Sequence, residues 1–154
     1  MINENQIKAL KELEKKGPLI LAPNHVSYVD FLVLSYIFYQ YGLKCPHVNS
    51  HEDFLSIKFL TKLLRSSGAF FIRKKGKTYD RLYSAIIIEY LNHLLEESCN
   101  LEIFIEISRT RSGKLTNPSN KVFDLFLKSY LNKEISTRNL YIVPVSINFE
   151  KLKL

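Results

Sequence analysis

The chain has few cysteines, and they show no pattern that binds a metal or builds a disulfide framework. Cys45 and Cys99 are the only two among 154 residues. Neither has a Cys or His neighbour at the spacing of metal ligands. We therefore predict no metal site and a reducing compartment.

Long apolar runs are also lacking. The longest candidate, Phe31–Tyr39, is bounded by Asp30 and Gln40. It falls short of the roughly 18 residues that a membrane span requires. Met1 is followed by polar residues instead of a signal peptide. No repeat, low-complexity tract or linker divides the chain, so we expect one domain over residues 1–154 and no membrane span.

Acidic residues are outnumbered by basic ones. The chain has 22 Lys and Arg against 15 Asp and Glu, for a formal net charge of +7. This excess favours an anionic partner such as a phosphate ligand, an acidic lipid surface or nucleic acid. Because no nucleic-acid recognition motif accompanies the charge, we predict no nucleic-acid partner. Hydrophobic residues make up 46% of the chain, which is enough for a packed core.

Helical and strand-like patterns alternate along the sequence. The helical spacing of apolar residues predicts helices over 4–15, 28–41, 56–68, 81–96 and 121–131, the first within an amphipathic segment 1–17. Short apolar stretches predict strands over 18–23, 69–73, 101–108 and 141–149. Such alternation indicates an α/β fold with a mostly parallel central sheet flanked by helices.

The segment NHVSYVD contains a candidate general base. Pro23 ends the first strand and the next helix starts near Tyr28, so His25 lies before the helix and Asp30 in its first turn. A ring N–H of His25 can then donate to Asp30, which leaves the other ring nitrogen to remove a proton from a hydroxyl. The alternative is structural: Asp30 or Ser27 caps the helix and His25 is a surface turn residue.

Basic residues follow two of the predicted strands at their carboxyl ends, where His25 also lies: Arg73, Lys74, Lys75, Arg109, Arg111 and Lys114. In a parallel α/β sheet this edge faces the crevice where ligands bind. Arginine there offers a planar fork for a phosphate. Glu106 lies inside an apolar strand and requires a partner, for which Arg109 or Arg111 is the natural choice.

Four segments in order, NHVSYVD, GAFFIRK, FIEISRTRSGK and IVPVS, resemble the blocks of the glycerophospholipid acyltransferases. The resemblance covers residues 18–150 and is strongest to the branch that acylates glycerol 3-phosphate or dihydroxyacetone phosphate. It implies an acyltransferase-like domain that transfers a fatty acyl group from acyl-CoA to the sn-1 hydroxyl, with acyl-CoA as co-substrate and no further cofactor. His25 would be the base and Asp30 its orienting carboxylate, without an acyl-enzyme.

The same resemblance implies where the substrates bind. The positions that would contact or position the phosphorylated three-carbon acceptor are Ser27, Arg73, Lys74, Glu106, Arg109, Arg111, Lys114 and Pro144. It also implies a peripheral membrane surface as partner. The location would be an intracellular membrane, which is peroxisomal, mitochondrial or endoplasmic reticulum in a eukaryote and the inner membrane in a bacterium.

Three positions depart from the family pattern, and one of them is Lys74, which stands for the second Arg of the GAFFIR block and lacks its bidentate fork. Val26 stands where the family usually has Arg, and Ile107 stands where it usually has Gly. A β-branched residue cannot adopt backbone angles reserved for glycine. The chain also stops soon after the fourth block, as a C-terminally truncated domain would. These departures motivate an alternative, a catalytically impaired or truncated family member that acts as a membrane-surface lipid-binding module.

Overall fold

A computed structural model describes residues 2–27, 29–51, 56, 58–72, 81–106, 114, 117, 123–124, 127, 130–131 and 139–149. Its helices are α1 (Glu4–Glu14), α2 (Asp30–Gln40), α3 (Lys58–Ser66) and α4 (Arg81–Glu96). Its strands are β1 (Leu19–Pro23), β2 (His47–His51), β3 (Phe70–Ile72), β4 (Leu101–Glu102) and β5 (Tyr141–Val145). The five strands form one sheet in the order β3-β2-β4-β1-β5, with every neighbouring pair parallel. The predicted α/β class is confirmed.

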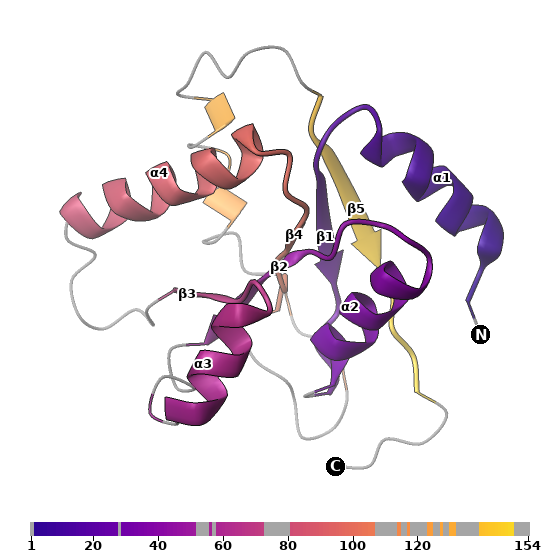
Figure 1. Ribbon diagram of the computed structural model, residues 1–154, viewed down its shortest axis with the longest axis horizontal. Helices are drawn as coiled ribbons and strands as arrows, with labels where there is room; N and C mark the ends of the chain where they lie inside the picture. Colours follow the sequence, from indigo (N-terminus) through magenta and orange to yellow (C-terminus); the bar gives the residue numbers. More distant parts are fainter. Residues whose placement is uncertain are drawn as a thin grey trace.

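Helices cover both faces of this sheet (Figure 1). Along β1, successive side chains alternate between the two faces, as they must in a strand. Ile20 packs with Leu101, Ile103 and residues of α4. Leu19 and Leu21 pack on the opposite face with residues of α1 and α2. The strand β1 is thus buried on both sides, and its carboxyl end at Pro23 delivers the following turn to the edge of the sheet.

Most predicted element boundaries hold within two residues. The predicted helices over 4–15, 28–41, 56–68 and 81–96 correspond to α1, α2, α3 and α4. Gly42 and Gly68, with positive φ angles of 68° and 85°, follow α2 and α3 closely, as a helix end requires. For the predicted helix over 121–131, only residues 123–124, 127 and 130–131 are described, and they are helical.

Three strand predictions need correction, and the first is the strand expected over 141–149, which ends at Val145. The strand β2 was not predicted, because its sequence HVNSH is mostly polar and gives no apolar run. The strand expected over 101–108 ends at Glu102, because the chain leaves the sheet beyond Ile103. Phe104 and Glu106 instead reach the turn that follows β1, as the contacts of His25 show below.

Asn100 connects several elements at the amino-terminal side of the sheet. Its side chain is fully buried. Its Oδ1 accepts from the backbone N–H of Leu19 at 3.0 Å, and its Nδ2 donates to Glu14 Oε1 at 2.6 Å and to the carbonyl of Lys44 at 2.9 Å. These bonds tie α1 and the segment before β2 to the start of β1.

We expect Asn100→Ala to lower the free energy of unfolding by about 2–4 kcal/mol, because it leaves buried donors and acceptors without partners. Urea unfolding followed by circular dichroism measures this change. Asn5→Ala, at an exposed position of α1, is the control and should change stability by less than about 0.5 kcal/mol. Equal effects of the two substitutions would contradict the role given to Asn100.

Candidate active site

The turn between β1 and α2 brings His25 and Asp30 together. His25 Nδ1 lies 3.2 Å from Asp30 Oδ2. The five-residue spacing permits this contact because His25 precedes the helix and Asp30 is its first residue. The geometry expected of a general-base dyad is therefore present. With Nδ1 directed at the carboxylate, Nε2 is the ring nitrogen that can exchange a proton with a substrate.

Asp30 also organises the turn itself. The residue is fully buried, and its Oδ2 accepts the backbone N–H groups of Val26 and Ser27, each at 2.8 Å. Its place at the first turn of α2 sets its negative charge against the positive end of the helix dipole. Asp30 therefore has both roles that the sequence suggested. Its Oδ2 accepts from the backbone of the turn and also contacts the imidazole of His25. Ser27 Oγ accepts from the backbone N–H of Val29 at 3.4 Å.

The segment after β4 supports His25 from a second direction. The Phe104 ring lies against the imidazole, with 4.3 Å between ring centroids and 38° between planes. Glu106 Oε1 accepts the backbone N–H of His25 at 3.0 Å, and Glu106 is buried. The sequence predicted Arg109 or Arg111 as the partner of Glu106, and those two residues lie outside the described residues. The structure shows a backbone partner, so Glu106 helps to fix the position of His25.

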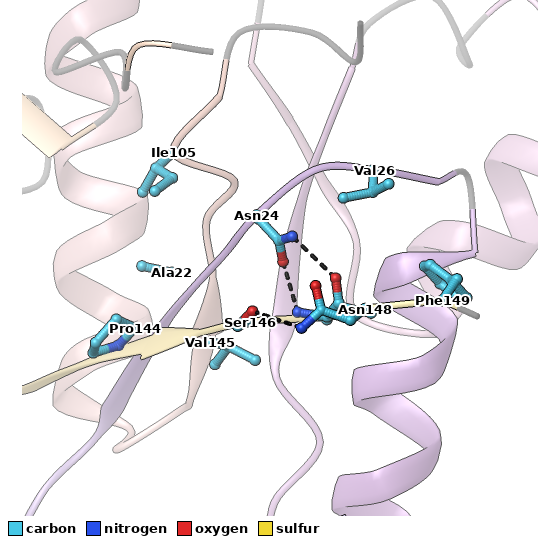
Figure 2. Close-up of a pocket in the computed structure, with 10 residues that line it drawn as sticks. Ala22, Asn24, Val26, Ile105, Pro144, Val145, Ser146, Asn148 and Phe149 are labelled. Carbon is cyan, nitrogen blue, oxygen red and sulfur yellow. Dashed lines mark hydrogen bonds between the residues drawn. The ribbon is translucent and has the colours of Figure 1, made fainter. Parts of the chain in front are cut away.

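A pocket of about 450 Å³ opens beside this turn (Figure 2). Asn24 and Val26, the neighbours of His25, line it together with residues from β1, the segment after β4, and β5 with its extension: Ala22, Ile105, Pro144, Val145, Ser146, Ile147, Asn148 and Phe149. Asn24 fixes one wall, because its side chain donates to the Ile147 carbonyl at 3.0 Å and accepts the Ile147 N–H at 2.7 Å. The lining is mostly apolar, so the pocket can accept an apolar group next to the base.

The structure places only some of the predicted site residues. His25, Ser27, Asp30 and Glu106 meet at the turn, and Pro144 lines the pocket. Lys114 is exposed. The remaining predicted cations, Arg73, Lys74, Arg109 and Arg111, lie outside the described residues, as does Ile107. Within the part of the chain that the structure describes, no three His, Cys, Asp or Glu side chains are grouped so that they could hold a metal ion.

Sequence reasoning missed Asn24, Phe104 and Glu102. Asn24 directly precedes His25, and an asparagine just after a strand is a frequent partner of backbone groups. Phe104 reads as an ordinary core residue, and nothing in its spacing marks it as a contact of His25. Glu102 carried the same signal as Glu106, a carboxylate within an apolar stretch.

The comparison with known proteins agrees with the resemblance found in the sequence. The acyltransferase family model matches residues 4–148. The dihydroxyacetone phosphate acyltransferases of Homo sapiens and Mus musculus are each 35% identical to this chain. The glycerol-3-phosphate acyltransferase of Pseudomonas aeruginosa (strain LESB58) is 31% identical. Each similarity covers 98% of this chain.

The chain belongs to the acyltransferase family. The match runs through the dyad, all five strands and every pocket residue except Phe149, because it extends from residue 4 to residue 148. The chain spans 22% of the length of the two mammalian relatives and 18% of the bacterial one. The resemblance to the glycerol 3-phosphate and dihydroxyacetone phosphate branch is likewise confirmed.

Proposed function

We propose that this chain transfers a fatty acyl group from acyl-CoA to the sn-1 hydroxyl of dihydroxyacetone phosphate or glycerol 3-phosphate, in glycerophospholipid or ether-lipid synthesis. The observation that carries the proposal is the contact of His25 Nδ1 with Asp30 Oδ2 next to a mostly apolar pocket. The names of the similar proteins support the choice of acceptor. The two acceptors share a primary hydroxyl and a phosphate, so they suit the same site.

The mechanism is direct transfer with general-base catalysis. Nε2 of His25 takes the proton of the acceptor hydroxyl as the oxygen attacks the thioester carbonyl. Asp30 stabilises the imidazolium that forms, and Glu106 and Phe104 hold the histidine in place. The tetrahedral intermediate collapses with cleavage of its C–S bond, and the departing CoA thiolate receives from the imidazolium the proton that came from the acceptor hydroxyl. Ester formation and thiol release then balance without an acyl-enzyme.

The two substrates have separate places in this proposal. The pocket formed by Ala22, Ile105, Pro144 and their neighbours accepts the apolar part of the acyl group beside the base. The phosphate of the acceptor is assigned to Arg73, Lys74, Arg109, Arg111 and Lys114, on the family resemblance and on their predicted places after the carboxyl ends of strands. Val26, which stands where the family usually has Arg, lines the pocket and adds an apolar wall instead of a cation.

Acceptor-dependent release of CoA thiol tests the proposal. Purified protein is incubated with long-chain acyl-CoA and either acceptor, and thiol is followed with a chromogenic reagent. The proposal expects release that requires the acceptor and saturates with it. If release does not depend on either acceptor, the catalytic assignment fails and the lipid-binding module becomes the better account.

An exposed apolar and basic surface on α3 supports membrane association. Phe59 and Leu63 are 82% and 53% exposed, and they lie one helical turn apart on the same face. Three exposed cations lie on the same helix: Lys58, Lys62 and Arg65. Apolar side chains flanked by cations suit an anionic lipid surface. We therefore propose that α3 lies on the membrane. None of the described helices is long and apolar enough to cross a bilayer.

The double substitution Phe59→Ser/Leu63→Ser should reduce binding to vesicles that contain anionic phospholipid by about tenfold or more, since two large apolar groups no longer enter the interface. Cosedimentation measures the bound fraction. Leu82→Ser, which changes a leucine on α4 that is 65% exposed, is the control and should bind as wild type does. If the double variant also binds normally, another part of the protein covers or replaces this surface.

A further inference from the structure

Glu102 is a buried carboxyl group at the centre of the sheet. It lies in β4 between Leu101 and Ile103, which both pack on the α4 side. Because side chains alternate along an extended chain, Glu102 points to the opposite side, toward α2. Its partners in register are Leu21 on β1 and Val48 on β2, which are buried and apolar. No part of the Glu102 side chain reaches solvent.

Glu102 and Asp30 both have buried carboxyl oxygens without a hydrogen-bond partner among the described residues. Among the described residues, neither carboxyl oxygen of Glu102 has a hydrogen-bond partner, and neither does Asp30 Oδ1. Asp30 contacts His25, and Phe104 and Glu106, which follow Glu102 closely in the chain, contact the same histidine. The other oxygen, Asp30 Oδ2, already accepts from Val26, Ser27 and His25.

Two neighbouring buried carboxyl groups cannot both ionise at low cost. The backbone N–H groups of Val26 and Ser27 donate to Asp30 Oδ2, whereas none of the described groups donates to Glu102. Glu102 therefore keeps the proton. In agreement, burial raises the pKa of Glu102 to about 9, and the negative charge of Asp30 contributes in the same direction. Glu102 thus offers an O–H donor, and Asp30 Oδ1 offers an acceptor.

We propose that Glu102 is a positioning residue of the acyl-transfer site, which donates its carboxyl O–H to Asp30 Oδ1 and so holds the Asp30 carboxylate charged and aimed at His25. The proposal rests on the function assigned to His25 above. It places a second carboxyl group behind the dyad, inside the sheet. The support for the base then runs from β4 through α2 to the turn after β1.

The effect of removing this O–H donor on the titration of His25 can be predicted. Without it, the carboxylate beneath His25 is less stabilised and the pair of Asp30 and His25 binds a proton more tightly. A hydrogen bond to a charged group is strong enough to change that affinity by about tenfold, or about one pH unit. An amide at position 102 still donates an N–H, whereas a thioether of similar size does not.

Glu102→Gln and Glu102→Met are the matched variants. The His25 imidazole is titrated by NMR, with its resonance assigned by its absence in His25→Ala, and the acid limb of kcat/KM is measured in parallel. We expect Glu102→Gln to leave the apparent pKa of His25 and the acid limb of kcat/KM as they are in wild type. Glu102→Met should raise the apparent pKa of His25 and the acid limb by about one pH unit. If Glu102 had a structural role alone, both variants would change in stability, and the His25 pKa would not differ between them.

Wild type and Glu102→Gln suffice if Glu102→Met does not fold. The groups that face Glu102 from its neighbours are Asp30 on α2 and the uncharged Leu21 and Val48 on β1 and β2. Loss of the Glu102 proton should therefore give the wild-type His25 resonance a second step near pH 9, and Glu102→Gln should lack that step. A wild-type titration without the step, or an unchanged His25 pKa in folded Glu102→Met, overturns the proposal.

The NMR readout does not depend on turnover. If the protein releases no thiol but the His25 titration splits as expected, the proposed function fails and the link between Glu102 and the dyad stands. If thiol release depends on the acceptor but the titrations of wild type and both variants coincide, the function stands and the role of Glu102 fails.

Discussion

His25→Ala is expected to lower kcat for acceptor-dependent acyl transfer by about 10²- to 10⁴-fold, the usual contribution of a positioned general base. The imidazole acts on a proton that moves during the attack, so its loss raises the barrier of the chemical step. It makes no charge contact with the acceptor phosphate in this mechanism, and KM should change little. Steady-state thiol release at saturating acyl-CoA measures both constants.

His93→Ala is the matched control for this substitution. His93 lies on α4 and is exposed, so its removal should leave kcat within about twofold of wild type. Circular dichroism confirms that both variants fold. A His25→Ala protein that is folded and keeps the kcat of wild type would show that His25 is not the base.

The stability of Glu102→Gln relative to wild type should increase steeply with pH. An unfolded glutamate loses its proton near pH 4.5, whereas folded Glu102 keeps it up to about pH 9. Between these values the native state binds one proton more than the unfolded state, so raising the pH destabilises wild type. The loss amounts to as much as about 1.4 kcal/mol per pH unit, and glutamine, which does not titrate, avoids it.

Urea unfolding of wild type and Glu102→Gln at pH 5, 6.5 and 8 measures this slope. The difference in the free energy of unfolding should move in favour of Glu102→Gln at each step. Glu97→Gln, at an exposed position, is the control and should show no such slope relative to wild type. A difference that stays constant with pH would mean that Glu102 is ionised in the folded protein.

The fold could be predicted from the sequence where local patterns are strong. The alternation of helical periods with short apolar stretches predicts parallel strands and crossover helices, and α4 was located to the residue. β2 was missed because its pairing with β3 and β4 is decided by the neighbouring strands, not by the side chains of HVNSH. The strand order, with β4 inserted between β2 and β1, is a tertiary property that no local pattern contains.

The site could be predicted in part for a similar reason. Pro23 and the apolar spacing after it place His25 and Asp30 on either side of a helix start, and this made their contact predictable. The contacts of Phe104 and Glu106 with His25 join residues about 80 positions apart, which requires the parallel pairing of β1 with β4. Glu102 shows the same limit, because its partner Asp30 lies on a different element.

The product of the reaction tests the central claim most directly. Purified protein is incubated with isotope-labelled acyl-CoA and dihydroxyacetone phosphate or glycerol 3-phosphate, and the acylated products and the intact protein are analysed by mass spectrometry. The account predicts a 1-acyl ester of the acceptor, formed in amounts equal to the CoA released, with no label on the protein. Label attached to the protein, or CoA released without any acylated acceptor, would contradict direct transfer by the His25 and Asp30 pair.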